Sequence, residues 1–237
     1  MTFQFGRYSV LINPFHKRAL RSITPEATRT TEYSLDKLVD ILKGNFEWVL
    51  SGGLAIPTTI GSFYRIHDDI DIGIHERDLE KLTEAAAQNE YGLFSRIFMT
   101  KISTAHKVDV YKSVSPEEAL EKQCKRLRLV RLGKNGKIAR HDNLLDYFDV
   151  YTHYYEDGEL VSNEGGTRVP LFNNYGKTYA TISGKKIMVR ALEYIEQLKL
   201  RGKDEKDKHD LRILRMSGFA ESHEQEQDEQ TPLAMTG

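Results

Sequence analysis

Residues 51–74 read SGGLAIPTTIGSFYRIHDDIDIGI, and the rest of the chain is interpreted outward from them. They follow an apolar run at residues 46–50 that has the length and composition of a short strand. The Gly-Gly pair then marks a turn into a helix over residues 54–60. Acids and isoleucines alternate at residues 68–74, which predicts a second strand with one polar and one apolar face. The segment therefore predicts a strand–turn–helix–strand unit.

The Gly-Gly turn has the properties of a phosphate-binding site. Ser51, Gly52 and Gly53 lie where a strand is expected to meet the N-terminal end of a helix. Such an end offers unsatisfied backbone N–H groups and a partial positive charge, and both favour phosphate. The Ser51 hydroxyl is a further donor. A Gly-Gly pair alone is most often only a turn, so this interpretation needs support from the second strand.

Two acids on the second predicted strand have the spacing of a metal-binding pair. Asp69 and Asp71 are two residues apart, so their side chains project from one face with Cα atoms about 6–7 Å apart. Carboxylates this close repel each other unless a cation lies between them. Ile70 and Ile72 point the other way, into a core. Because Mg²⁺ prefers one or two carboxylates plus phosphate oxygens, a phosphate cradle followed by this pair predicts phosphoryl or nucleotidyl transfer.

The remaining pattern predicts an α/β fold. We expect a small mixed, strongly twisted sheet flanked by helices, with a C-terminal helical segment that closes a cleft. Helices are predicted at residues 34–43 behind a Ser34 cap, 77–89, 116–125, 187–200 and 206–216. Strands are predicted at residues 8–12, within 92–114, at 144–155 and at 159–161, and a hairpin turn is predicted at 133–136.

The segment resembles the polymerase-β-type nucleotidyltransferase superfamily, most closely its lincosamide, aminoglycoside and abortive-infection-toxin branches. Those proteins carry a Gly-Gly turn, a helix and an Arg-x-His-Asp-Asp-hydrophobic-Asp strand. The residues that match in order and spacing are Gly52, Gly53, Gly61, Arg65, His67, Asp68, Asp69, Ile70 and Asp71. A second match lies near the other end of the chain, where Lys199 and the run KDKHDL at residues 206–211 are similar to a Lys…Lys-Asp-x-x-Asp-Leu signature.

The resemblance implies a nucleotidyltransferase-type sheet and a metal-dependent transfer of a nucleoside monophosphate from an NTP, ATP included. It implies that Asp69 and Asp71 bind two Mg²⁺ ions and that pyrophosphate is released. The nucleotide would be bound by residues of the turn, the motif and the C-terminal helices: Ser51, Gly52, Gly53, Arg65, His67, Lys199 and Lys206. The expected organisation is an N-terminal arm (1–30), a catalytic domain (31–185), C-terminal helices (186–218) and a disordered acidic tail (219–237).

The superfamily also uses a third acid on a later strand, and two residues compete for that place. Asp149 lies in an apolar strand followed by a turn and a further strand, a layout similar to the family's third-acid hairpin. Asp109 has an equally strand-like setting and lies closer to Asp71 in the sequence. We favour Asp149 as the third metal-binding and catalytic acid, with Asp109 as the alternative.

The acceptor of the nucleotide is left open between two classes. One is a small molecule such as an antibiotic hydroxyl, and the other is RNA such as a tRNA end, as in toxin-like members that pair with an antitoxin or other protein partner. Eight Lys and Arg residues at positions 122–140 tilt the balance slightly toward RNA, although a charge run is often only a solvated face. A relative that binds nucleotide or a partner without catalysis is the remaining alternative, and the intact acid pair counts against it.

Composition sets the broad class. The chain has 237 residues, of which 39% are hydrophobic and 29% charged, and its net charge of -1 argues against a generally basic nucleic-acid protein. The single cysteine, Cys124, and the lack of a long apolar run predict a cytoplasmic protein without a membrane span. Residues 1–25 contain no acid, as in some targeting segments, but Pro14 would interrupt the amphipathic helix of such a segment. We therefore expect a structured N-terminal arm.

Overall fold

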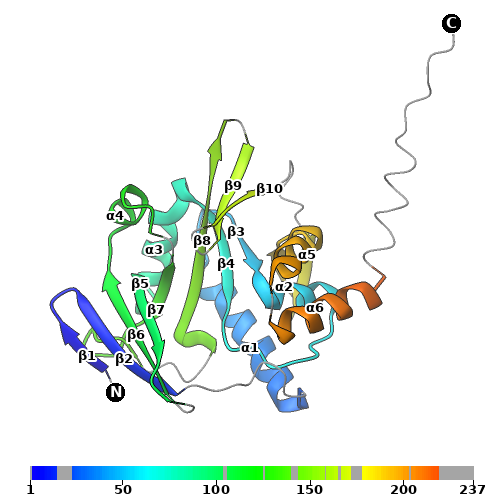
Figure 1. Ribbon diagram of the computed structural model, residues 1–237, viewed down its shortest axis with the longest axis horizontal. Helices are drawn as coiled ribbons and strands as arrows, with labels where there is room; N and C mark the ends of the chain where they lie inside the picture. The colour runs from blue at the N-terminus through cyan, green and yellow to red at the C-terminus, as the bar shows by residue number, and fades with distance from the viewer. Residues whose placement is uncertain are drawn as a thin grey trace, which may run out of the picture.

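One mixed β-sheet organises the protein (Figure 1). The computed structural model describes residues 2–14, 23–103, 106–124, 126–139, 144–157, 159–164, 167–171, 178–202 and 204–218. Within these residues, twelve strands form a sheet in the order β1-β2-β6-β5-β7-β8-β4-β3-β12-β11, and β9 and β10 extend from β8. The predicted α/β class is confirmed as an open, twisted mixed sheet flanked by helices. The sheet is larger than the small one expected.

The strands of the first half are β1 (Thr2–Phe5), β2 (Tyr8–Pro14), β3 (Trp48–Ser51), β4 (Asp71–His75), β5 (Tyr91–Lys101) and β6 (His106–Ser113). Those of the second half are β7 (Leu127–Arg131), β8 (Tyr147–Glu156), β9 (Glu159–Glu164), β10 (Thr167–Leu171), β11 (Thr178–Ile182) and β12 (Lys185–Val189). The pairs β4–β8 and β12–β3 are parallel and the other pairs are antiparallel. The parallel β4–β8 pair at the centre of the sheet carries two of the predicted acids, Asp71 and Asp149.

The helices are α1 (Pro25–Ile41), α2 (Gly52–Ile60), α3 (Leu79–Ala87), α4 (Pro116–Glu121), α5 (Leu192–Arg201) and α6 (Glu205–Met216). Two short 3₁₀ helices, η1 (Glu76–Asp78) and η2 (Leu144–Asp146), precede α3 and β8. In Figure 1, α2, α5 and α6 lie together on one side of β3 and β4, and contacts join all three helices to one another. The predicted C-terminal helical segment therefore packs on the helix that begins at the Gly-Gly turn.

Alternation along the central strands separates the core from the site. Ile72 and Ile74 of β4, with Phe148 and Val150 of β8, are buried in the main hydrophobic core against the apolar faces of the helices. The neighbouring residues Asp71 and Asp149 belong to the opposite face, because side chains alternate along a strand. A second apolar cluster lies in the β2–β6–β5–β7–β8 part of the sheet and consists of Leu11, Phe94, Tyr111, Val130, Ile138 and Tyr147.

The first helix begins earlier than predicted. Ser34, expected as its cap, lies inside α1 and donates to the carbonyl of Thr30 (2.8 Å). The helix starts at Pro25 because Thr24 accepts a hydrogen bond from the amide of Ala27 (3.2 Å) and a proline fits the first turn. The boundary expected between residues 30 and 31 therefore falls inside a helix.

The expected helix at 187–200 was wrong in its first part. Residues 185–189 form β12, which pairs with β11 across a turn at Ser183 and Gly184, both with positive φ (50° and 80°). Val189 also pairs with Leu50 of β3, so β12 is tied into the sheet beside the site, and α5 starts at Leu192. The boundary expected between residues 185 and 186 thus falls inside a strand.

Two further expectations concern the ends of the chain. Residues 2–14 form the β1–β2 hairpin at one edge of the sheet, where β2 pairs with β6. The acidic tail expected at 219–237 lies outside the described residues. Among the described helices, none has the length and apolar content needed to cross a bilayer.

Candidate active site

Three carboxylates come together at the N-terminal end of β4. Asp69, Asp71 and Asp149 each offer a carboxylate oxygen, and these oxygens lie within 4.8 Å of one another. Asp71 and Asp149 are register partners on parallel β4 and β8. Asp69 precedes β4, which begins three residues later than the predicted strand. Asp149 is 9% exposed, and the other two are half-buried. The arrangement is an acid cluster open to solvent on one side.

The Gly-Gly turn lies directly under this cluster. Ser51 ends β3 opposite Asp71 of β4, and α2 begins at Gly52. Gly52 has a φ of 62°, and a Cβ added there would overlap the carboxylate of Asp71. Only glycine therefore permits both this backbone conformation and this close approach of the acid. The start of α2 therefore lies directly beside Asp71 of the acid cluster.

The second glycine makes room for two motif side chains. A Cβ on Gly53 would overlap the guanidinium of Arg65 and would come to 3.4 Å from Nδ1 of His67. His67 is 5% exposed, and its Nε2 has no hydrogen-bond partner within the described part of the chain. Burial, and then the neighbouring charge of Arg65, lower the pKa of His67 to about 3. His67 is therefore neutral at pH 7 beside the turn.

Arg65 is engaged by the last helix. Its Nε and Nη2 donate to the two carboxylate oxygens of Asp210 on α6 (2.7 and 2.8 Å), and the Asp210 carboxylate is completely buried. Lys199 of α5 also contacts Asp210 (3.0 Å) and donates to Asp207 (2.7 Å). These bonds tie both C-terminal helices to the segment that leads into Asp69. Two acids of the KDKHDL run, Asp207 and Asp210, therefore connect α6 to Lys199 and to Arg65 of the Arg-x-His-Asp-Asp segment.

The predicted nucleotide-binding residues therefore divide into two groups. Ser51, Gly52, Gly53 and His67 lie at the turn beside the acids, whereas Arg65 and Lys199 make ion pairs within the protein. Lys206 is the second residue of α6, is half-buried, and lies close enough to His67 to lower the pKa of that histidine. A direct nucleotide contact thus remains a prediction for each residue, and for Arg65 and Lys199 it would have to coexist with an internal ion pair.

Asp109, the alternative third acid, lies elsewhere. It sits on β6, opposite Leu11 of β2, three strands away from β8 in the sheet order. It is fully buried, and the amine of Lys107 lies 3.5 Å from its carboxylate. Of the two candidates, Asp149 is the one that lies beside Asp69 and Asp71.

From the sequence, Arg128 was interpreted as one member of a basic run. In the structure it contacts the acid cluster through Asp149. Its Nε and Nη2 donate to the two carboxylate oxygens of Asp149, and its Nη1 donates to the hydroxyl of Tyr111 (2.8 Å). The sequence signal for this role was an arginine inside the apolar strand LRLVR. Side chains alternate along a strand, so Arg128 shares one face with the apolar Val130. The hydroxyl of Tyr151 also donates to Asp71 (3.3 Å).

Two further members of the basic run lie beside acids of the chain. Lys122 contacts Glu118 (2.8 Å), and Arg131 lies 3.9 Å from Asp146. Arg126, Lys134 and Lys137 are exposed, while Lys125 and Arg140 lie outside the described residues. Part of the positive charge that tilted the sequence interpretation toward RNA is thus neutralised within the protein.

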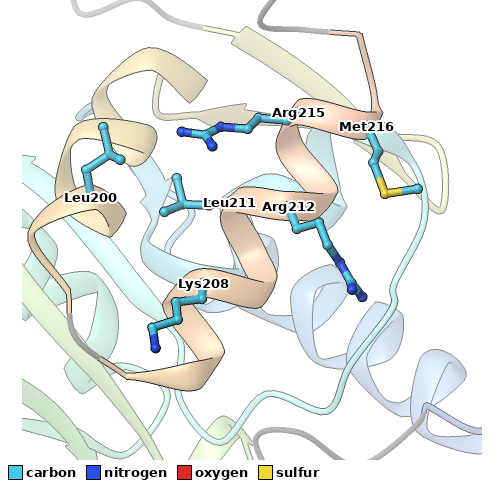
Figure 2. Close-up of a pocket in the computed structure, with 6 residues that line it drawn as sticks. All are labelled: Leu200, Lys208, Leu211, Arg212, Arg215 and Met216. Atoms are coloured by element: carbon cyan, nitrogen blue, oxygen red, sulfur yellow. The ribbon is translucent and has the colours of Figure 1, made fainter.

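A surface hollow of about 450 Å³ lies on α5 and α6 (Figure 2). Figure 2 shows Leu200, Leu211 and Arg215 reaching toward one another between these helices, while Arg212 and Met216 extend from the other side of α6. Its lining residues are Leu200, Lys208, Leu211, Arg212, Arg215 and Met216. None of them is a predicted site residue, and none of the three acids lines this hollow.

Part of the chain matches a known protein family. Residues 34–127 match the aminoglycoside-2''-adenylyltransferase family. The match covers the Gly-Gly turn and the first two acids, and it confirms the resemblance to the nucleotidyltransferase superfamily and its antibiotic-resistance branches. No curated protein sequence shows significant similarity to the chain.

Two solved structures are similar at low identity. The lincosamide antibiotic adenylyltransferase LnuA with bound lincomycin is 16% identical, with a TM-score of 0.46, and the likeness covers 82% of this chain and 98% of that one. ANT(2'')-Ia in complex with adenylyl-2''-tobramycin is 13% identical, with a TM-score of 0.41, and the likeness covers 85% of this chain and 94% of that one. The functional assignment therefore depends on the family match and on the site itself.

Proposed function

We propose that this protein is a Mg²⁺-dependent nucleotidyltransferase that moves a nucleoside monophosphate from an NTP to a hydroxyl group of a small molecule. One observation carries the proposal: the Asp69, Asp71 and Asp149 carboxylates converge within 4.8 Å over a Gly-Gly turn at a helix N-terminus. Carboxylates that can bind a metal ion thus lie next to a helix start that can bind a triphosphate. Neither feature alone would define a reaction, and together they suit transfer at a phosphorus atom.

The three acids fit a divalent cation. Mg²⁺ prefers carboxylate oxygens supplemented by phosphate oxygens and water, and such oxygens form this cluster. Three carboxylates this close repel one another, and Arg128, which contacts Asp149, offsets only part of their charge. We infer that Asp69 and Asp71 hold two Mg²⁺ ions and that Asp149 completes the site. When bound, the ions would polarise the phosphoryl oxygens and favour the deprotonated acceptor hydroxyl.

The chain's own groups would bind and orient the reactants. The N–H groups at the start of α2 and the Ser51 hydroxyl would hold the triphosphate, with neutral His67 beside the turn and the amine of Lys206 as a further predicted contact. The acceptor oxygen then forms a bond to the α-phosphorus as the bond to the β-phosphate oxygen breaks. Pyrophosphate leaves with that electron pair. Asp149 lies at the third corner of the cluster, where a carboxylate can take the hydroxyl proton or hold a metal ion.

The family match favours a small-molecule acceptor. The matching family is described by its adenylyl transfer to aminoglycosides, and the motif of this chain also resembles that of the lincosamide branch. The buried ion pair of Arg128 with Asp149 weakens the case for RNA, because this cation of the basic run is not free to bind a phosphate backbone. We therefore propose a hydroxylated antibiotic of the aminoglycoside or lincosamide kind, with ATP as the first nucleotide to test.

The experiment incubates the protein with each of the four NTPs labelled at the α-phosphate. Parallel reactions contain Mg²⁺ or EDTA and either a panel of aminoglycosides and lincosamides or total RNA. Mg²⁺-dependent label on a small molecule, lost in Asp71→Asn, is the expected result. Label on RNA alone would overturn the acceptor class. NTP binding without transfer to any acceptor would instead support a non-catalytic nucleotide-binding relative.

A further inference from the structure

Arg128 and Asp149 face each other across the antiparallel β7–β8 pair. Two nitrogens of the guanidinium donate to the two oxygens of the carboxylate, and the Nη2 bond measures 2.8 Å. Arg128 is 2% exposed, so this charge pair is almost entirely shielded from water. An arginine remains protonated at any pH at which the protein is folded, so its positive charge is a permanent part of the acid site.

The orientation of Arg128 is fixed from three directions. Its third donor, Nη1, bonds to the hydroxyl of Tyr111 (2.8 Å), and Tyr111 is itself fully buried. The guanidinium carbon lies 4.2 Å from the centre of the Tyr147 ring, which stabilises a cation over the ring face. The guanidinium thus binds both oxygens of Asp149, donates to the Tyr111 hydroxyl and packs against the Tyr147 ring. Arg128 cannot rotate without breaking several of these contacts.

We infer that Arg128 is a positioning residue and the built-in counter-ion of the acid site. It holds Asp149 in one orientation beside Asp69 and Asp71, and it offsets one of the three negative charges before any divalent ion arrives. This inference rests on the proposed function, because it assumes that the acids bind a metal. It adds that the chain weakens its own affinity for the free metal ion, so that the ion binds firmly only when a triphosphate supplies further negative charge.

The two parts of this role have different chemical requirements. Offsetting charge needs only a cation, which lysine also provides. Holding both oxygens of one carboxylate needs the planar fork of arginine, which lysine lacks. Substitution by methionine removes both functions, and substitution by lysine removes only the second. The pair of variants therefore separates the charge of Arg128 from its geometry.

The test measures Mn²⁺ binding, thermal stability and turnover in wild type, Arg128→Met and Arg128→Lys. Removing one positive charge a few ångströms from the ion should tighten Mn²⁺ binding without nucleotide by about tenfold in Arg128→Met. Arg128→Lys should bind Mn²⁺ within about twofold of wild type. In both variants kcat should fall by about 10- to 100-fold, the usual cost of losing a group that orients a metal ligand. The KM for NTP should change less.

A merely structural arginine would give a different pattern. Loss of such a residue would lower the melting temperature equally in EDTA and in Mn²⁺. The counter-ion role requires that Arg128→Met lose less stability in Mn²⁺ than in EDTA, because tighter binding to the folded state stabilises it. Arg131→Met is the matched control, since Arg131 lies on the same strand, is half exposed and contacts only Asp146 among the described acids. It should leave metal binding and turnover unchanged.

Each outcome decides one point. Unchanged or weaker Mn²⁺ binding in Arg128→Met overturns the counter-ion inference, while the proposed function stands if wild type binds Mn²⁺ and Asp71→Asn does not. Absence of Mn²⁺ binding by wild type, with or without NTP, contradicts the proposed metal site itself. If Arg128→Met does not fold in EDTA, folding restored by Mn²⁺ supports the inference, and failure to fold in both conditions counts against it.

Discussion

Asp71 of β4 and Asp149 of β8 are paired positions of one parallel ladder, and the amide of Asp149 donates to the carbonyl of Ile70 (2.9 Å). The backbone of β4 thus sets where the Asp149 carboxylate stands. Parallel pairing cannot be made by a tight turn, and here long intervening segments separate the two strands. The acid site therefore exists only when the whole central sheet has formed, which ties metal binding to global folding rather than to a local loop.

The first prediction concerns the acid pair. Asp69→Asn and Asp71→Asn should each reduce transfer by about 1,000-fold or more, because an amide cannot neutralise a divalent ion that contributes several kcal/mol to the transition state. Melting temperatures should stay close to wild type or rise in EDTA, since each change removes a repelling charge. Asp157→Asn, at an exposed turn with a φ of 52° that asparagine tolerates, is the control. Turnover retained in both site variants would remove the basis for the metal assignment.

The second prediction compares two glycines with similar backbone conformations. Gly52 and Gly61 have φ values of 62° and 72°, so alanine should cost about 1 kcal/mol of backbone strain at either position. Only at Gly52 does the new methyl group overlap a carboxylate, that of Asp71. We expect Gly52→Ala to weaken Mg²⁺-dependent NTP binding by about tenfold or more, and Gly61→Ala to leave it unchanged. Equal binding by the two variants in titration calorimetry would show that the turn is only structural.

A third prediction separates Asp149 from Asp109. Asp149→Asn should lower kcat by at least about 100-fold and change the KM for NTP much less, as expected for a group that acts on the acceptor or the metal. Asp109→Asn should lower stability, because Asp109 is fully buried beside Lys107, while the folded fraction keeps its turnover. Steady-state kinetics normalised to folded protein give the comparison. The reverse pattern would move the third-acid role to Asp109.

The fourth prediction concerns acid sensitivity. Burial alone would raise the pKa of Asp210, but its hydrogen bonds and charge interactions with Arg65 and Lys199 outweigh burial and lower the pKa below 3.8. The resulting stability is complete above the unfolded-state pKa and is lost as the pH falls through the lower folded-state pKa. Asp210→Asn should cost about 3–5 kcal/mol at pH 7, because it leaves Arg65 buried without its partner.

The stability gap between wild type and Asp210→Asn should narrow as the pH falls below 3.8, where the unfolded-state carboxyl is protonated. Urea unfolding at pH 7 and at several values from pH 4 downward measures this gap. Asp204→Asn, an exposed residue just before α6 whose side chain makes no capping bond, provides the comparison. A gap that stays constant over the whole range would mean that the pair contributes no charge-dependent stability.

The sequence predicted those parts of the fold whose signals are local. Ser51, Gly52 and Gly53 were placed at a strand-to-helix turn, and α6 was placed to within one residue of its start. The start of α1 was missed because the cap at Thr24 and Pro25 was overlooked in favour of the apolar spacing after Ser34. The β11–β12 hairpin was missed because its second strand continues directly into the apolar residues of α5.

The site was less predictable where it depends on strand pairing. Asp109 and Asp149 both alternate with apolar residues, and nothing local shows which strand lies next to β4. Arg128 was hidden for the same reason, since its role appears only when β7 lies beside β8. Arg65 and Lys199 were predicted from the resemblance to bind nucleotide, whereas the structure gives both of them Asp210 as a partner.

The bond between Arg65 and Asp210 has a practical consequence for anyone who recombines proteins of this type. Because the arginine lies shortly before the first acid and its partner lies on the last helix, two segments far apart in the sequence form a matched pair that must come from the same parent. A hybrid that joined this catalytic segment to foreign C-terminal helices without a matching carboxylate would bury a guanidinium with no counter-charge. A crossover point should therefore be chosen so that Arg65 and Asp210 both come from the same parent protein.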